Sequence, residues 1–170
     1  MPINGETAFE TWPLGQTPTK IEINNASANK VFVSSKLYMP GVWQMPQWGI
    51  EDGEDPLSAA VRELQQETGV VSTEFIAEAP RWLTYDFPPS VKAKVNRLSQ
   101  GEWHGHAQKW FLMRLITDDS EIKITSDEVD PEWKWASPEE VVDQAVDHKR
   151  EMYVEVMRTF APFYNANKTL

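Results

Sequence analysis

The sequence predicts a single mixed α/β domain in which helices cover a sheet. Strand-like and helix-like segments are interleaved without a regular strand–helix–strand period, which is typical of a mixed sheet between helices. The 170 residues suffice for one domain with a substantial core and are too few for two. Because 41% of the residues are hydrophobic and 25% are charged, the composition is that of a globular protein.

The N-terminal part predicts an arm followed by a first strand. Residues 1–20 contain Gly, Pro and Thr without periodicity, so we expect a loose arm, then the domain at 21–165 and a tail at 166–170. Residues 30–37, KVFVSSKL, alternate well enough for a strand. Residues 39–48 hold two prolines and are expected to form a loop.

The next element is a helix with clear signals at both ends. Asp55 is followed by Pro56, which places a capping residue before a proline at the first helical position. Gly69 supplies the stop signal, so the helix between them has about 13 residues. The apolar residues expected to form most of one face are Leu57, Ala60, Val61 and Leu64.

Strands are predicted over most of the following segment. Residues 72–87 favour β structure and end at two prolines, and residues 91–98 form an amphipathic helix of one or two turns. Three further strands are predicted at residues 106–115, 121–124 and 132–137.

Two helices are predicted at the C-terminal end. Ser137 begins the first one, because the sequence S-P-E-E places a capping serine before a proline and two glutamates. Residues 149–164 have the apolar period of a helix, with Met152, Val156 and Phe160 on one face. Together with the earlier elements, these helices complete the helix–sheet–helix class.

Cysteine content and charge limit the classes of function. The chain has no Cys, which excludes disulfides, thiolate metal sites and a cysteine nucleophile. With only three His, a hard cation held by carboxylates is favoured over zinc. The 26 acidic residues exceed the 16 basic ones, and this field disfavours long-range capture of duplex nucleic acid. A small phosphorylated substrate can still bind where cations neutralise it locally.

The sequence contains no membrane or targeting signal that we recognise. No apolar run approaches the roughly 20 residues needed to span a bilayer. The N-terminal stretch lacks an apolar core, contains Glu and has no Arg, unlike a signal or transit peptide. We therefore expect a cytoplasmic protein without a membrane partner, and its oligomeric state stays open.

Residues 46–70, PQWGIEDGEDPLSAAVRELQQETGV, carry the candidate chemistry. Glu63, Gln66 and Glu67 follow the i, i+3, i+4 pattern, so they project from one face of the predicted helix. Like charges clustered on a helix are unfavourable unless a cation joins them. A solvated acidic face is the alternative, but a preceding glycine such as Gly49 permits close backbone approach to a ligand.

This segment resembles the Nudix box, whose pattern is G, five residues, E, seven residues, then R-E-U-x-E-E-x-G-U, with U aliphatic. Trp48 stands at the first glycine and Gln66 at a glutamate, so the box is degenerate. Such a long pattern is far more specific than a lone glycine-rich loop. The seven matching positions of the nine are Glu54, Arg62, Glu63, Leu64, Glu67, Gly69 and Val70.

The resemblance covers roughly residues 30–164. WQMPQ, WLTYDFPP, QKWF, EWKW and SPEE resemble segments of the plant-type asymmetric diadenosine tetraphosphate hydrolases, which are close relatives of bacterial RNA pyrophosphohydrolases. The resemblance implies the Nudix α/β/α sandwich, a mixed sheet with the box helix against one face. It also implies a small phosphorylated substrate, with an RNA 5′ end less favoured. Since such relatives are often plastidic, a transit segment missing from this chain would place it in the plastid.

Nudix enzymes hold divalent cations, usually Mg²⁺ with Mn²⁺ as an alternative, and direct water at phosphorus. A polyphosphate repels an oxygen nucleophile, so cations must spread that charge and position the water. The resemblance implies that Glu63 and Glu67 are catalytic and metal-binding, with Gln66 as a weaker ligand. Trp48 would present a backbone carbonyl to the metal. Glu128 is a further candidate ligand if one residue is inserted before the Trp-x-Trp segment.

The remaining site residues support the box or contact the substrate. The resemblance implies that Glu54 and Arg62 pair and brace the loop on the helix, with Gly49 and Gly69 supporting the box. Tyr85, beside two prolines, resembles a residue that stacks on the nucleobase, and the alternative is a core tyrosine. Four further candidates for substrate binding are Lys109, Lys36, Gln47 and Trp82. His104 and His106 flank Gly105, and the interpretation as loop histidines without a role is favoured over a part in binding.

We expect magnesium-dependent hydrolysis of a diphosphate linkage in a dinucleoside polyphosphate or related nucleotide. Gln66 lacks the charge that holds a hard cation, so we expect activity weakened by roughly two orders of magnitude. One alternative is a catalytically lapsed domain that binds a nucleotide or a protein partner. Another is a hydrolase of prenyl or other metabolite diphosphates, because an indole at position 48 near Trp43, Met45 and Trp82 favours an apolar chain.

Overall fold

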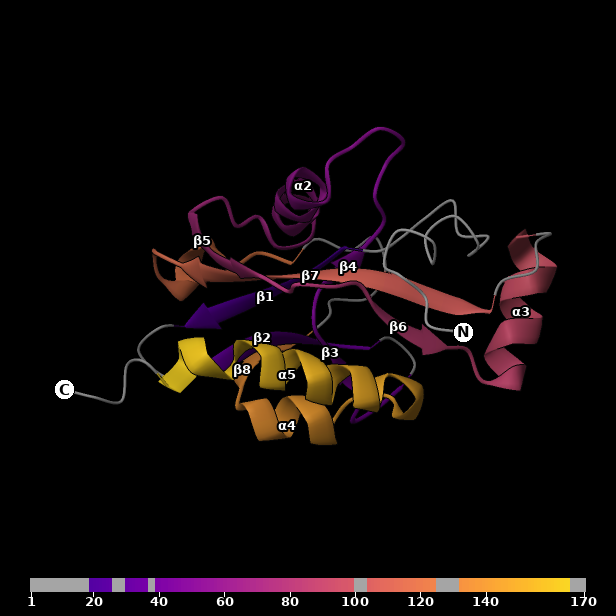
Figure 1. Cartoon of the computed structure of the whole chain (residues 1–170). Helices are drawn as coiled ribbons and strands as arrows, with labels where there is room; N and C mark the ends of the chain where they lie inside the picture. Colours follow the sequence, from indigo (N-terminus) through magenta and orange to yellow (C-terminus); the bar gives the residue numbers. More distant parts are fainter. Residues whose placement is uncertain (1–18, 26–29, 37–38, 100–103, 125–131, 166–170) are drawn as a thin grey trace.

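The protein has three layers, with a sheet between helices (Figure 1). Helix α2 (Pro56–Thr68) lies on one face of the sheet, and α4 (Pro138–Asp143) and α5 (Arg150–Asn165) cover the other. The predicted α/β/α sandwich is therefore confirmed. This computed structural model describes residues 19–25, 30–36, 39–99, 104–124 and 132–165.

Strand β7 (Gly105–Leu115) is the centre of a mixed sheet. It pairs in parallel with β1 (Thr19–Asn25) and antiparallel with β5 (Thr73–Glu78) and β6 (Leu83–Asp86). β1 pairs antiparallel with β2 (Lys30–Ser35). The strands predicted at 106–115 and within 72–87 are confirmed, the latter region being divided into two strands.

Three short strands complete the sheet. β2 pairs with β8 (Trp133–Ala136) and with β3 (Trp43–Gln44), and β4 (Gln47–Trp48) pairs with β1. The prediction of a loop at residues 39–48 was therefore wrong at two places, where pairs of residues join the sheet. Pro46 separates these two strands, because proline has no backbone N–H for a strand ladder.

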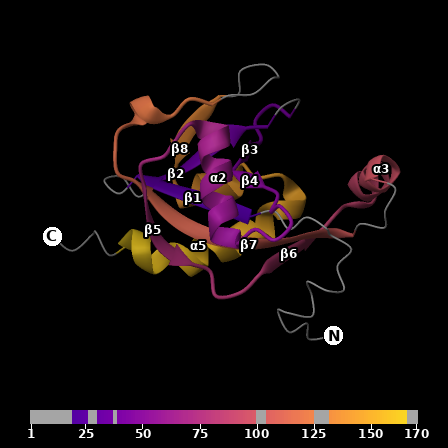
Figure 2. The ribbon, with the colours of Figure 1, turned by 90° about the horizontal axis from the view of Figure 1, so that it is seen from above.

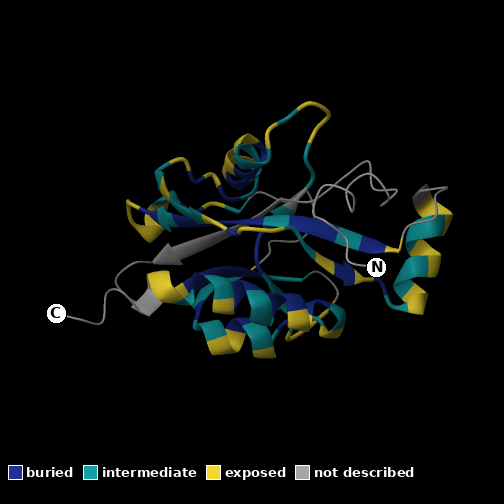
Figure 3. Ribbon diagram, viewed as in Figure 1, coloured by how far each residue is buried: buried dark blue, intermediate teal, exposed yellow. Residues whose placement is uncertain are grey.

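The core consists of two clusters, one on each face of the sheet. Side chains of β7 alternate between them, as expected for a strand covered on both sides, and Figure 3 shows the buried residues along the sheet. Met152, Val156 and Phe160 are buried on the α5 side, which confirms their predicted common face. The cluster on the α2 side contains Phe32, Ala60, Leu64, Val70, Phe111, Met113, Leu115 and Ile122.

Helix α2 has the predicted ends. The Asp55 carboxylate accepts a hydrogen bond from the backbone N of Ser58 at 3.1 Å, and Gly69 ends the helix at φ 72°. Val61 is 45% exposed, so its predicted place on the sheet-facing side was wrong. The buried stripe follows positions 60, 64 and 68, and position 61 lies about 100° farther round the helix axis.

The prediction of a strand at residues 121–124 was wrong. The 3₁₀ helix η1 (Asp119–Glu121) stands at its start, and Asp118 caps it by accepting from the backbone N of Ser120 at 2.9 Å. The backbone N of Lys123 then donates to the Thr68 carbonyl at 2.7 Å. These residues cover the end of α2 instead of joining the sheet.

The other predicted helices are present with changed limits. Helix α3 (Pro89–Ser99) begins two residues before the predicted 91–98 segment and lies at the far end of β6 and β7 (Figure 1). Ser137 caps α4 by accepting from the backbone N of Glu140 at 3.2 Å. In the described part of the chain, no helix is both long and apolar enough to cross a membrane. Of the predicted arm at 1–20, residues 1–18 lie outside the described residues, as does the tail at 166–170.

Candidate active site

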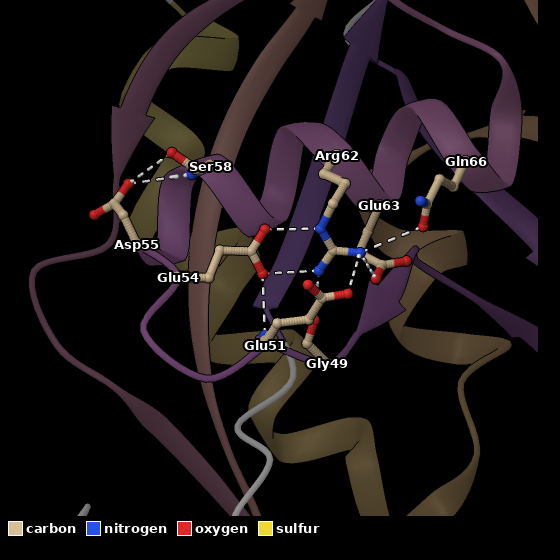
Figure 4. Close-up of polar contacts among 8 residues, drawn as sticks. All are labelled: Gly49, Glu51, Glu54, Asp55, Ser58, Arg62, Glu63 and Gln66. Atoms are coloured by element: carbon tan, nitrogen blue, oxygen red, sulfur yellow. Dashed lines mark hydrogen bonds and ion pairs between the residues drawn. The ribbon is translucent and has the colours of Figure 1, made fainter.

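Arg62 in α2 joins the helix to the loop that precedes it. Its Nε and Nη2 donate to the two carboxylate oxygens of Glu54 at 2.7 and 2.8 Å (Figure 4). Glu54 also accepts from the backbone N of Glu51 at 3.0 Å. The hydrogen bonds from Arg62 hold the pKa of the Glu54 carboxyl at about 2, so this pair stays charged at neutral pH. The structure thus places Glu54 and Arg62 as a brace between loop and helix.

The third nitrogen of the Arg62 guanidinium points along the helix toward the acidic face (Figure 4). Nη1 contacts the Glu63 carboxylate and donates to the amide oxygen of Gln66 at 3.3 Å. Nη2 also donates to the Gly49 carbonyl at 3.4 Å. One side chain therefore orients the loop, Glu63 and Gln66 together.

The oxygen donors on α2 suit a hard divalent cation. Glu63 and Glu67 are half-buried and one helical turn apart, and Gln66 is exposed on the same side. Carboxylate and amide oxygens are ligands of Mg²⁺ and similar ions. Among the described residues there is no group of three or more His, Cys, Asp or Glu placed to hold a metal. Glu63 and Glu67 are the two candidate carboxylates on this face, and the third candidate, Glu128, lies outside the described residues.

The loop differs from what its glycines and Trp48 suggested. Trp48 belongs to β4 and pairs with Thr19, so this position needs no left-handed backbone. A Cβ added at Gly49 would have no heavy atom of the protein within 4 Å, so packing within the fold does not require glycine there. Gly53 and Gly69 do have positive φ, 75° and 72°. At these two positions another residue would be strained.

A pocket of about 510 Å³ opens beside β6 on the face covered by α5. The 3₁₀ helix η2 (Asp147–Lys149) and the first turn of α5 form its other wall. Figure 2 shows α2 lying over β1, β4 and β7, on the opposite face. The residues lining the pocket are Thr84, Tyr85, Asp86, Phe87, Pro88, Asp147, His148, Glu151 and Met152.

Aromatic rings form the inner surface of this pocket. Tyr85 is 7% exposed, and its ring lies 5.6 Å from the ring of His148 and 6.1 Å from that of Phe87, centroid to centroid. Burial raises the pKa of Tyr85, so its hydroxyl is protonated at neutral pH. Burial and the nearby Lys149 lower the pKa of His148, which is therefore neutral at that pH. The sequence analysis missed His148.

Lys149 is the second residue that the sequence analysis missed. It is 4% exposed, and its Nζ donates to Oε1 of Gln47 at 2.7 Å and lies 5.5 Å from the centre of the Tyr85 ring. Burial, followed by the charge of Lys36, lowers the pKa of Lys149 to about 7. Within the described part of the chain, no carboxylate oxygen lies within 4.0 Å of its amine. A buried amine without a carboxylate partner favours an incoming anion.

The other predicted substrate contacts are dispersed. Lys36 is half-buried and lies near Lys149. Lys109 on β7 forms an ion pair with Glu78 on β5 at 3.3 Å and is not among the described residues that line the pocket. Trp82 lies in the turn before β6 and is not among the described residues that line the pocket.

Gly105 fixes the distance between β7 and the pocket strand β6. A Cβ added there would collide with the Tyr85 backbone and lie 2.9 Å from Cα of Asp86. We expect Gly105→Ala to lower the free energy of unfolding by about 1–3 kcal/mol, because β6 must move. Urea titration measures this, with Gly49→Ala as the matched control, since a Cβ at position 49 has open space. Equal loss of stability in both variants would contradict the explanation.

The fold and the braced acidic helix define a hydrolase of the Nudix class. The family model described as the NUDIX domain matches residues 25–156. The chain is 61% identical to "Nudix hydrolase 25" of Arabidopsis thaliana over 162 residues, covering 92% of this chain and 93% of that protein. The chain therefore belongs to the Nudix hydrolase family, and the prediction of an enzyme is confirmed.

Two further comparisons extend this result. A protein of Cereibacter sphaeroides named "RNA pyrophosphohydrolase" is 43% identical over 136 residues, covering 78% of this chain and 82% of that protein. The crystal structure of an Ap4A hydrolase of C. elegans superposes with a TM-score of 0.59 at 20% identity, over 87% of this chain and 97% of that one. The likeness to that structure shows the fold alone.

Proposed function

We propose that this protein hydrolyses a diphosphate linkage in a dinucleoside polyphosphate, with diadenosine tetraphosphate as the representative substrate and Mg²⁺ as the cofactor. The proposal depends mainly on one observation: β4 and the first residue of the following loop contact both the acidic helix α2 and the region beside the pocket. Gln47 contacts Lys149 beside the pocket, while the Gly49 carbonyl contacts Arg62 beside the acidic face. The pocket side and the acidic face are therefore both in contact with residues 47–49.

The acidic face supplies the reactive half of this site. Glu63 and Glu67 would hold Mg²⁺, and Gln66 offers an uncharged oxygen. A bound divalent cation polarises phosphoryl oxygen and lowers the pKa of water. Arg62 keeps Glu63 oriented through Nη1 and keeps the loop in place through Glu54. The two carboxylates are also the proton acceptors that this face offers to an attacking water.

The pocket supplies recognition of the nucleotide. The half-buried ring of His148 lines the pocket and offers a face on which a nucleobase can stack, and the nearly buried Tyr85 ring packs 5.6 Å from it. Such stacking contributes about 1–3 kcal/mol per base. Lys149 and Lys36 neutralise phosphate charge next to that base. This local cationic pair allows an anion to bind although the whole chain carries a net charge of −10.

Two other substrates serve as alternatives in the test. An RNA 5′ end is suggested by the 43% identical relative named for that activity. A prenyl diphosphate has less support, because Met45 is fully buried and Trp43 packs against the α5-side core with Lys134 over its ring. Neither residue is among the described residues lining the pocket.

A substrate panel tests the proposal. The purified chain is assayed with diadenosine tetraphosphate, a 5′-triphosphorylated RNA oligonucleotide and geranyl diphosphate, each with Mg²⁺ or with EDTA. We expect the highest kcat/KM for the dinucleotide and loss of turnover in EDTA. Turnover no greater than that of Glu63→Gln would exclude the proposed hydrolase activity. A higher kcat/KM for RNA or geranyl diphosphate would show that the dinucleotide is not the preferred substrate.

Lys149→Met separates the binding role of the lysine from its effect on stability. The pKa of Lys149 lies near 7 rather than the ordinary 10.5, so the unfolded chain binds more protons between these values. Stability of the wild type therefore rises with pH across this window, and this rise is absent from the variant. At pH 7 we expect the variant to be about 0.5–2 kcal/mol more stable and its KM about tenfold higher.

Urea unfolding at pH 6 and pH 9, together with steady-state kinetics, measures both effects of Lys149→Met. Lys134→Met is the control, because that lysine is paired with Glu140 at 3.8 Å and has no role in the proposed site. An unchanged KM in Lys149→Met would remove the lysine from the proposed site.

A further inference from the structure

Four polar side chains beside the pocket form one hydrogen-bonded chain. Lys149 Nζ donates to Gln47 Oε1 at 2.7 Å, and the side chain of Gln47 is hydrogen-bonded to the Tyr85 hydroxyl. That hydroxyl lies 2.6 Å from Nδ1 of His106. The chain crosses from η2 through β4 and β6 to β7, so it joins elements far apart in the sequence.

When Lys149 is charged, the chemistry of these groups assigns a direction to each bond. An ammonium can only donate, so Gln47 uses its oxygen toward Lys149 and its NH₂ toward Tyr85. The Tyr85 hydroxyl accepts that bond and donates its own hydrogen to His106 Nδ1, which requires the neutral ring with its proton on Nε2. The effect on Tyr85 agrees, because the bond from Gln47 acts to lower the pKa that burial raises.

We propose that Gln47 is a positioning residue for the nucleotide, holding the Lys149 ammonium and the Tyr85 ring in fixed relation, with His106 as the terminal acceptor. This inference rests on the proposed function, in which Lys149 binds phosphate and the Tyr85 ring packs against the His148 ring on which the base stacks. It changes the role of Gln47 from the predicted direct substrate contact and gives His106 a role as a hydrogen-bond acceptor.

Gln47 is placed to control both partners at once. Its oxygen accepts the hydrogen bond from the Lys149 ammonium. Its NH₂ holds the hydroxyl end of the Tyr85 ring, which is nearly buried. The charged and titratable side chains around the amine in the described residues are Lys36, His148, Asp147 and Tyr85. The positive charge of Lys36 disfavours the charged form of Lys149, whereas the Gln47 oxygen favours it. Loss of that oxygen should therefore lower the pKa of Lys149 further.

Titration of the protein without nucleotide tests the first bond. The ¹³C shift of the lysine ε-carbons is followed against pH, and Lys149→Arg identifies the Lys149 signal. Gln47→Met keeps the volume but removes both hydrogen bonds, and we expect the Lys149 midpoint to fall. Gln47→Glu keeps an acceptor and adds a countercharge, and we expect the midpoint to rise. The fall in Gln47→Met is the discriminating result, because a residue that only fills space would leave the midpoint unchanged, whereas Glu raises it through its charge.

Nucleotide binding tests the positioning role. We expect Gln47→Met to weaken binding of a non-hydrolysable diadenosine tetraphosphate analogue about tenfold at pH 7.5, with the loss smaller at pH 6, where more Lys149 is charged. His106→Phe should weaken binding in the same direction, and His106→Gln should restore it because its amide oxygen accepts from Tyr85. The combined Gln47→Met and His106→Phe variant should lose less than the product of the two single effects.

The outcomes separate this inference from the proposed function. Wild-type affinity and an unchanged Lys149 midpoint in Gln47→Met would overturn the inference. If the wild type binds no dinucleotide analogue, the proposed function fails, and the titration without nucleotide still decides whether Gln47 controls Lys149. Urea unfolding of each variant shows that it is folded before binding is compared.

Discussion

Replacing Glu63 with Gln is expected to lower kcat by about 10²–10³-fold with Mg²⁺ present. The α2 face already carries Gln66 in place of one carboxylate, so this change leaves Glu67 as the remaining charged ligand among the three. A hard cation is held mainly by ligand charge, and the amide keeps the shape of the side chain without that charge. The expected loss is therefore chemical rather than structural.

Two measurements and a matched variant examine the Glu63→Gln effect. Steady-state kinetics gives kcat, and Mn²⁺ binding followed by electron paramagnetic resonance reports the metal site directly. Glu51→Gln is the control, because Glu51 has a 75% exposed side chain and lies 3.7 Å from Arg62 Nη1 without belonging to α2. A Glu63→Gln variant with kcat within threefold of the wild type would contradict the assignment of Glu63.

Replacing Gln66 with Glu is expected to raise kcat by about 10²-fold and to tighten divalent metal binding. The new carboxylate adds one negative charge to the face that already holds Glu63 and Glu67, at the position whose oxygen lies 3.3 Å from Arg62 Nη1. Part of its charge is neutralised by Arg62, so the gain in metal affinity falls short of that from an isolated carboxylate.

Gln65→Glu is the matched control for this gain. It adds the same charge one residue earlier on α2, on an exposed position about 100° round the helix from Gln66. The Mg²⁺ dependence of turnover and the Mn²⁺ affinity are compared among the wild type and both variants. Equal gains in both would show a general field effect. No gain in Gln66→Glu would mean that position 66 does not limit this enzyme.

The box helix was predictable because its determinants are local. Asp55 and Gly69 satisfy backbone groups within a few residues, and the helical period alone places Glu63 and Glu67 on one side. The brace between Glu54 and Arg62 also spans only eight residues. A pattern in one short segment therefore predicted the helix, its ends and the brace that holds the preceding loop.

Predictions failed where neighbours in space decide the conformation. Residues 121–124 have the apolar content of a strand, yet Lys123 is held by the end of α2 through Thr68. Trp48 stands where the resembled pattern has glycine, and pairing with Thr19 gives this position an extended backbone that any residue can adopt. In both cases a contact far along the chain outweighs the local preference, which for strands depends strongly on context.

The sequence by itself determined the family, the order of most elements and the acidic face of α2, because those features depend on capping, period and a long pattern within one segment. The residues that come together at the pocket, in contrast, could be found only from the tertiary structure. Gln47 and Lys149 lie 102 positions apart, and neither carries a local signal for the other. Their meeting depends on β4 joining β1 and η2 packing beside β6, which are long-range contacts between whole elements.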